Sequence, residues 1–176
     1  MTMIKAIFID RDGTLLNEPK TEIINTWDKF RIKNEIHCLT KLPSEYKLFI
    51  ISNQEGINER KLEQKFYDET NKKLLSALDK HGVKIEKIYT CPHTIEENCN
   101  CRKPKVGLIK QANKDFQIII EKSWIIGDRI SDVVLAQTSG MKSIFIKSQL
   151  HALDDIRPDF IAENLCEAVE NINKNL

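Results

Sequence analysis

Short apolar runs that alternate with helical patterns constrain the fold of this chain more than any other feature. Each run is four to six residues long, which suits a strand buried on both faces. The runs occupy residues 4–9, 47–52, 123–127 and 143–146, with weaker strand patterns at 83–89 and 160–162. Helical patterns lie at residues 34–42, 60–81, 106–113, 131–137 and 165–172. The alternation predicts an α/β fold, with a mainly parallel sheet covered by helices on both faces.

Two helical patterns carry signals at their ends. Asn34 stands at the start of the pattern at 34–42 and is a candidate N-cap. Gly82 follows the long amphipathic pattern at 60–81, in the position where glycine commonly ends a helix. These signals predict a short helix before the second strand and a long helix after it.

Length and charge exclude several classes of protein. The chain has 176 residues and no linker, repeat or low-complexity segment, which suits a single domain over residues 1–176. A net charge of +1 argues against a nucleic-acid or anionic-membrane partner. No apolar run approaches a membrane span and the N-terminus lacks a signal-peptide pattern, so we expect a cytoplasmic protein. The sequence does not give the oligomeric state, and a monomer is the simplest expectation.

Polar clusters follow the predicted strands or lie in the loops after them. The carboxyl ends of parallel strands meet at one edge of a sheet, so these clusters are expected to converge. Each cluster alone is also compatible with an ordinary polar turn or a surface charge, and their joint placement favours a site. The clusters are Asp10/Asp12, Ser52/Asn53, Arg102/Lys103 and Asp128/Asp132.

Together these residue types supply what phosphoryl transfer needs. Carboxylates hold Mg²⁺ through hard oxygen ligands, and one can act as a nucleophile that forms an aspartyl phosphate. A second carboxylate can exchange a proton with the leaving oxygen and then with water. A hydroxyl and a lysine can neutralise the phosphoryl oxygens. The sequence therefore predicts phosphatase chemistry at this edge of the sheet.

The four clusters resemble, in order, the four motifs of the haloacid dehalogenase superfamily of phosphatases. The resemblance runs over nearly the whole chain and implies a Rossmann-like three-layer sandwich. The matching segments are Asp10-Arg11-Asp12-Gly13-Thr14, Ser52-Asn53, Lys103 and Gly127-Asp128-Arg129-Ile130-Ser131-Asp132.

The resemblance implies a role for each acidic residue. Asp10 would be the nucleophile and a Mg²⁺ ligand. Asp12 would be the general acid and base, and its backbone carbonyl would also bind the metal. Asp128 would bind Mg²⁺, with Asp132 supporting it from behind.

The other two motifs would hold the substrate. By the same resemblance, Ser52, Asn53 and Lys103 would bind the phosphoryl group. Arg102 and Arg129 could bind a second phosphate or a sugar hydroxyl.

The loop at residues 91–101 carries a set of soft metal ligands. Cys91-Pro92-His93 and Cys99-Asn100-Cys101 provide three thiolates and one imidazole, which suits a closed, structural Zn²⁺ site. The loop leads into Arg102-Lys103, so a bound Zn²⁺ would fix the lysine in place. A metal-free loop of reduced cysteines is the alternative, and a redox role is disfavoured because Cys-x-Cys is not the usual redox spacing. Cys38 and Cys166 lie in helical patterns and are predicted to be small core residues.

The zinc loop narrows the resemblance to a capless branch (subfamily IIIA) that contains histidinol-phosphate phosphatases and D-glycero-D-manno-heptose 1,7-bisphosphate 7-phosphatases. No block is large enough for a cap domain, so loops 15–30, 54–59 and 91–102 should cover an open site. The segment around Glu18 resembles the histidinol-phosphate branch, where this carboxylate could face the cationic end of histidinol. A solvated Glu18 is the alternative. The tail after residue 157 resembles the heptose branch, but the usual Gly-Tyr segment is missing, and the preference for histidinol phosphate is slight.

Two further classes remain as alternatives. A nucleic-acid end phosphatase shares the first motif, but the near-neutral charge and the lack of a basic, aromatic-studded stripe argue against it. An inactive, zinc-clipped binding module would keep the fold without the chemistry. The intact set of Asp10, Asp12, Lys103 and Asp128 argues against that reading.

Overall fold

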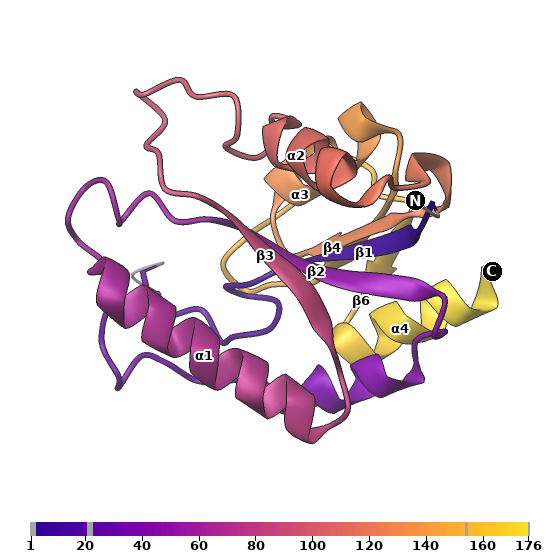
Figure 1. Cartoon of the computed structure of the whole chain (residues 1–176), viewed down its shortest axis with the longest axis horizontal. Helices are drawn as coiled ribbons and strands as arrows, with labels where there is room; N and C mark the ends of the chain where they lie inside the picture. Colours follow the sequence, from indigo (N-terminus) through magenta and orange to yellow (C-terminus); the bar gives the residue numbers. More distant parts are fainter. Residues whose placement is uncertain (1–2, 21–22, 154, 176) are drawn as a thin grey trace.

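The structure, a computed structural model, describes residues 3–20, 23–153 and 155–175. Six parallel strands form one sheet in the order β3-β2-β1-β4-β5-β6, with helices on both faces (Figure 1). The elements are β1 (Lys5–Asp10), η1 (Asn34–Lys41), β2 (Tyr46–Asn53), α1 (Gln64–Lys80), β3 (Ile85–Cys91), α2 (Gly107–Phe116), η2 (Ile120–Lys122), β4 (Trp124–Gly127), α3 (Ile130–Ser139), β5 (Lys142–Ile146), β6 (Phe160–Ala162) and α4 (Leu165–Lys174), where η denotes a 3-10 helix.

The central strand β1 shows why its sequence is apolar without interruption. Ile7 and Ile9 pack into a core under η1, α1 and α4, whereas Ala6 and Phe8 pack into a second core under α2 and α3. Successive side chains of a strand point to opposite faces, so a strand covered on both sides needs apolar residues at every position. The predicted α/β architecture and mainly parallel sheet are confirmed.

The sheet order brings the strand ends together. Phe8 pairs with Phe49 of β2 on one side and with Ile125 of β4 on the other, so β1 lies between these two strands. All the strands are parallel, and the residues at the ends of β1, β2, β3 and β4 therefore share one edge. The described helices include none long and apolar enough to cross a membrane.

Two predictions about helices need correction. The segment predicted as a helix at 34–42 is the 3-10 helix η1, and Asn34 is its first residue; the N-cap is Lys33, which makes no side-chain capping hydrogen bond. The predicted Asn34 cap is therefore wrong. The long helix α1 begins at Gln64 rather than at residue 60. Arg60 adopts a left-handed conformation with φ of 58°, and the N–H groups of the next two residues bond back to the Gly56 carbonyl, so a turn precedes the helix. Gly82 lies just beyond the end of α1 with φ of +76°, as predicted.

Cys38 and Cys166 also differ from the prediction. Cys38 is buried in the core as expected, but its sulfur is bonded to Cys166 in a disulfide. The bond joins η1 to α4, two helices that pack together although 128 residues separate the two cysteines. Sequence alone could not pair them, because the contact depends on how both helices pack on the same face of the sheet.

The disulfide should contribute substantially to stability. Replacing Cys166 by alanine is expected to lower the free energy of unfolding by about 3 kcal/mol, because a cross-link over a long loop restricts the unfolded chain. Denaturant titration of the two proteins measures the difference. Wild-type protein, unfolded without reductant and with chelator present, should expose three thiols, the ones that remain unpaired. Five thiols and an unchanged unfolding midpoint would contradict the assignment.

Candidate active site

The loop after β1 is shaped around a close contact with the fourth motif. β1 ends at Asp10, and the loop closes through hydrogen bonds from the Leu15 and Leu16 N–H groups to the Arg11 carbonyl. Gly13 has φ of +88°, and a Cβ placed there would lie 2.1 Å from an oxygen of Asp128. Glycine is needed at this position both for its backbone conformation and for its lack of a side chain.

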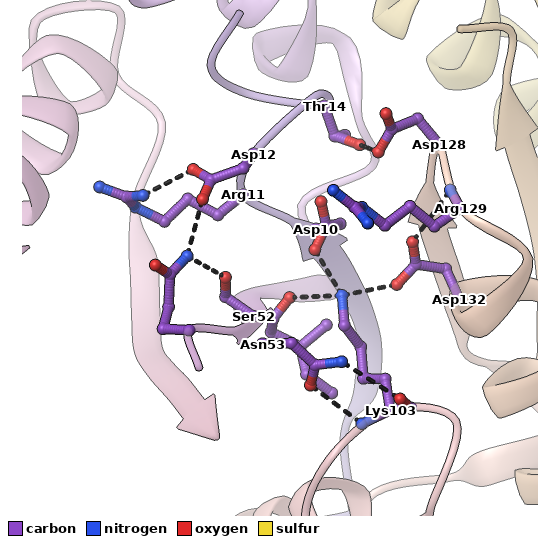
Figure 2. Close-up of polar contacts among 12 residues, drawn as sticks. Asp10, Arg11, Asp12, Thr14, Ser52, Asn53, Lys103, Asp128, Arg129 and Asp132 are labelled. Carbon is purple, nitrogen blue, oxygen red and sulfur yellow. Dashed lines mark hydrogen bonds and ion pairs between the residues drawn. The ribbon is translucent and has the colours of Figure 1, made fainter. Parts of the chain in front are cut away.

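Lys103 lies at the centre of the site. Its ammonium group donates hydrogen bonds to Asp10, to Asp132 Oδ1 at 2.7 Å and to the Ile51 carbonyl at 3.2 Å (Figure 2). Asn53 brackets the lysine backbone, because its amide accepts from the Lys103 N–H at 2.9 Å and donates to the Lys103 carbonyl at 3.1 Å. The predicted clusters Ser52/Asn53 and Arg102/Lys103 thus come together, with Asn53 fixing the position of the lysine backbone.

The buried charged groups of this cluster shift one another's pKa values. Burial raises the pKa of Asp10 well above its ordinary value; Lys103 opposes that shift, and Asp132 and Asp128 add to it. Burial would lower the pKa of Lys103, but Asp10 and Asp132 raise it, so the lysine stays charged. Burial, Asp132 and Glu18 raise the pKa of Asp128 to about 6. Three carboxyl groups around one lysine leave an excess of negative charge, which a cation would relieve.

A divalent metal fits this excess of acid. Asp10, Asp128 and Asp132 each offer an oxygen, and these atoms lie within 4.8 Å of one another. Oδ1 of Asp128 accepts from the Thr14 hydroxyl at 3.4 Å, whereas Oδ2 is buried and has no hydrogen-bond partner in the described part of the chain. An orphaned buried carboxylate oxygen beside two more carboxylates is the donor chemistry that Mg²⁺ prefers.

Asp132 has a different set of partners from Asp128. Besides Lys103, it accepts a hydrogen bond from the Arg129 backbone N–H at 3.3 Å, at the first turn of α3. A Cβ at Gly127 would lie 2.2 Å from an Asp132 oxygen, so this motif also depends on a glycine. Asp132 therefore orients Lys103 and the start of α3 at once.

A cleft of about 740 Å³ opens above these residues. Asp10, Asp12, Ser52 and Lys103 line it, together with segments of all three loops predicted to cover the site. The predicted substrate residues Asn53, Glu18, Arg102 and Arg129 line it as well. The structure thus places every predicted phosphate- and substrate-binding residue around a single opening.

Glu18 is neither solvated nor free. Only 3% of its side chain is exposed, Oε1 pairs with the Arg129 guanidinium, and Oε2 lies 2.8 Å from His151 Nε2. The solvated alternative is therefore wrong. His151 was not predicted, because it lies far along the chain with no motif around it, and only the fold brings it to Glu18.

The Cys/His loop gathers its four predicted ligands into one cluster. The three sulfurs are separated by 3.2, 3.4 and 3.6 Å, and Nδ1 of His93 lies 3.2 Å from Cys101 Sγ and 3.6 Å from Cys91 Sγ. Zn–S bonds of about 2.3 Å would place tetrahedral sulfurs about 3.8 Å apart, close to these spacings. Although burial opposes it, hydrogen bonds from the Arg102 N–H and from neighbouring groups lower the pKa of Cys99 to about 6. Burial raises the pKa of Cys91 and of Cys101, so the fit to a Zn²⁺ ion rests on the geometry of the four ligand atoms.

Comparison with known proteins finds one family model and a set of curated relatives that match this chain. A family model described as HAD-hydrolase-like matches residues 100–168. Proteins named histidine biosynthesis bifunctional protein HisB are similar over most of the chain. The protein of Actinobacillus pleuropneumoniae is 37% identical over 78% of this chain and 39% of its own length, and that of Legionella pneumophila is 33% identical over 98% and 49%. The chain spans less than half the length of these relatives.

Solved structures share the fold. A D,D-heptose 1,7-bisphosphate phosphatase of B. bronchiseptica, crystallised with magnesium and phosphate, superposes with a TM-score of 0.88 at 19% identity, covering 98% of this chain and all of its own. The corresponding enzyme of Burkholderia thailandensis gives a TM-score of 0.70 at 15% identity, covering 96% and 98%. At this identity the likeness concerns the architecture, which is the three-layer fold described above.

Proposed function

The chain belongs to the haloacid dehalogenase-like hydrolases, and on that premise we propose that it is a Mg²⁺-dependent phosphatase of small phosphomonoesters. One observation carries the proposal. The buried Lys103 is held between Asp10 and Asp132, beside an Asp128 oxygen without a partner, at the base of an open cleft. Acidic ligands for a cation and a fixed positive charge therefore meet where a phosphoryl group can enter.

The reaction would proceed through a covalent intermediate. The Asp10 carboxylate attacks phosphorus, the bond to the ester oxygen breaks, and Asp12 gives that oxygen a proton. Water then attacks the aspartyl phosphate, Asp12 takes its proton, and phosphate leaves with Asp10 restored. Both carboxylates line the cleft, as this sequence of steps requires.

The remaining groups would neutralise and orient the phosphoryl oxygens. Lys103 provides a positive charge beside Asp10, and the Ser52 hydroxyl, which lines the cleft, would donate a hydrogen bond to a phosphoryl oxygen. Mg²⁺, held by Asp10, the Asp12 carbonyl and Asp128 with Asp132 behind them, would supply further charge neutralisation. Zn²⁺ at Cys91, His93, Cys99 and Cys101 would be structural, within one domain over residues 1–176.

The charges of the cleft favour histidinol phosphate over heptose bisphosphate as substrate. Each arginine predicted to bind a second phosphate already pairs with a carboxylate, Arg129 with Glu18 and Arg102 with Glu55 at 2.8 Å. A cleft rim whose arginines are paired with carboxylates suits a substrate with one phosphate and a distal end that is neutral or cationic. The bifunctional relatives are named for histidine biosynthesis, which supports the same choice. D-glycero-D-manno-heptose 1,7-bisphosphate is the alternative, supported by the structural likeness.

Phosphate release from the two substrates, measured side by side with Mg²⁺, tests the proposal. A kcat/KM preference of tenfold or more for histidinol phosphate is expected. The reverse preference would assign the heptose role, while cleavage of an aryl phosphate alone would support the chemistry without either metabolite. No release from any ester would overturn the phosphatase assignment.

Glu18 should control this preference. The Glu18→Gln variant is expected to reduce kcat/KM for histidinol phosphate about tenfold, because removing the negative charge that Glu18 places beside Arg129 and His151 makes the rim more positive and disfavours a cationic distal end. The same change removes the negative charge of Glu18 from beside Arg129, so the ratio of the two kcat/KM values should move toward the bisphosphate. Glu121→Gln, in η2 before β4, is the matched control. An unchanged ratio of the two kcat/KM values would remove Glu18 from substrate recognition.

A further inference from the structure

The carboxylate of Asp12 is held at both oxygens. Oδ1 accepts from Arg11 Nη1 at 2.6 Å, and Oδ2 accepts from Gln54 Nε2 at 2.7 Å. The Asp12 side chain is 14% exposed, so it reaches the cleft while two buried neighbours fix its direction. A proton-transferring group gains from such support, because displacement by about 1 Å can cost about 100-fold in rate.

Arg11 is itself anchored by helix α1. It is 1% exposed, donates from Nε to Asn71 at 2.8 Å and from Nη2 to Thr70 at 2.7 Å, and lies over the Tyr67 ring at 4.9 Å. The remaining nitrogen of the Arg11 guanidinium, Nη1, is thereby directed at Asp12. Arg11 therefore holds the Asp12 carboxylate from a position that helix α1 makes rigid.

Gln54 connects two functional groups from different segments, Asp12 in the loop after β1 and Ser52 in β2. Its Nε2 donates to Asp12 Oδ2 and also to the Ser52 hydroxyl oxygen at 2.8 Å. The amide must present nitrogen here, since a carbonyl oxygen facing the Asp12 carboxylate would be repulsive. The Ser52 oxygen accepts from Gln54, which leaves the Ser52 hydrogen available to a phosphoryl oxygen in the cleft.

We propose that Gln54 is a positioning residue that couples the acid–base carboxylate of Asp12 to the phosphate-binding hydroxyl of Ser52. Its single amide group sets the distance between them and the direction in which each faces the phosphoryl group. Gln54 itself is 7% exposed, and its backbone N–H is fixed on the Cys91 carbonyl at 2.7 Å, so the amide has a rigid base. This role rests on the proposed phosphatase function.

The Gln54→Met variant tests the role, because methionine keeps the length of the side chain and removes both donors. Gln64→Met is the matched control, since Gln64 is exposed at the start of α1 and its amide contacts Asp68. Both variants are assayed with histidinol phosphate, whose alkoxide needs a proton to leave, and with p-nitrophenyl phosphate, whose phenolate leaves easily. Thermal unfolding of all three proteins establishes that they are equally folded.

A positioning role gives a distinctive kinetic pattern. Gln54→Met should lower kcat for histidinol phosphate about 100-fold with KM within threefold of wild type. With p-nitrophenyl phosphate the first turnover should remain fast while the later attack of water slows, which produces a burst of one nitrophenol per enzyme. The control should show neither effect.

Two results would overturn the assignment. Wild-type kcat in Gln54→Met would remove Gln54 from the reaction, and an equal slowing of the first and later turnovers would make its role merely structural. Wild-type protein that releases no phosphate from either ester would instead overturn the proposed function, and the positioning role with it.

Discussion

The Asp10→Asn variant is expected to lose at least about 10⁴-fold in phosphate release, because removal of a covalent nucleophile leaves only the electrostatic part of catalysis. Asparagine has the shape of aspartate but cannot form the acyl phosphate. The loss should appear in kcat for histidinol phosphate, for heptose bisphosphate and for an aryl phosphate alike, since all three would share the same first step.

The same variant should keep its fold. Burial raises the pKa of Asp10, Lys103 opposes that shift, and Asp132 and Asp128 add to it, so a neutral amide at this position avoids both the cost of burial and the repulsion from the two carboxylates. Lys103 retains Asp132 and the Ile51 carbonyl as partners when the charge on residue 10 is removed. Thermal unfolding should therefore stay within a few degrees of wild type. Asp115→Asn, in an exposed pair with Lys87, serves as the control, and full activity in Asp10→Asn would refute the nucleophile assignment.

Loss of zinc is expected to have the largest effect on stability. Cys99→Ser should bind far less zinc and lose about 3 kcal/mol or more of folding free energy, because metal binding at a closed Cys/His site contributes directly to folding. Activity should fall as well, since the Arg102 N–H is hydrogen-bonded to the Cys99 sulfur at 3.3 Å and Lys103 is the next residue. Metal analysis and denaturant unfolding measure the two effects.

A second pair of cysteines provides the control for this experiment. The double variant Cys38→Ala/Cys166→Ala removes the disulfide but leaves all four loop ligands in place, so its zinc content should equal that of wild type. Wild-type protein whose melting temperature is unchanged by a strong chelator would count against a structural zinc ion.

Much of the fold could be predicted because the strands are buried on both faces. Strands such as β1 and β4 carry apolar residues at nearly every position, and the predicted runs match the observed strands to within one or two residues. η1 was harder, since the apolar spacing at 34–42 suits an α-helix and a 3-10 helix almost equally over so few residues. The start of α1 was hidden because the left-handed Arg60 has no signal in the sequence.

The residues of the candidate site also differ in how far the sequence could predict them. Asp10 at the end of β1 and Lys103 in the loop between β3 and α2 were found because the strand pattern predicts that these segments meet at one edge and because both match family motifs. Their supporting partners were not found, because His151 and the Thr70–Asn71 pair reach the site only through tertiary packing. Gln54 was within reach of sequence reasoning, since it stands two residues after Ser52 and so shares a side of the extended chain.

The position of β1 between β2 and β4 also determines how late in synthesis the site can be completed. The strand that carries Asp10 is the first to be made, yet its partners at residues 46–53 and 124–127 follow much later. Until β4 emerges from the ribosome, one edge of β1 has no partner, and the nascent chain exposes an unpaired apolar strand. Such distant pairing slows folding. A ribosome that pauses before residue 128 would therefore hold a chain that is vulnerable to aggregation as well as inactive.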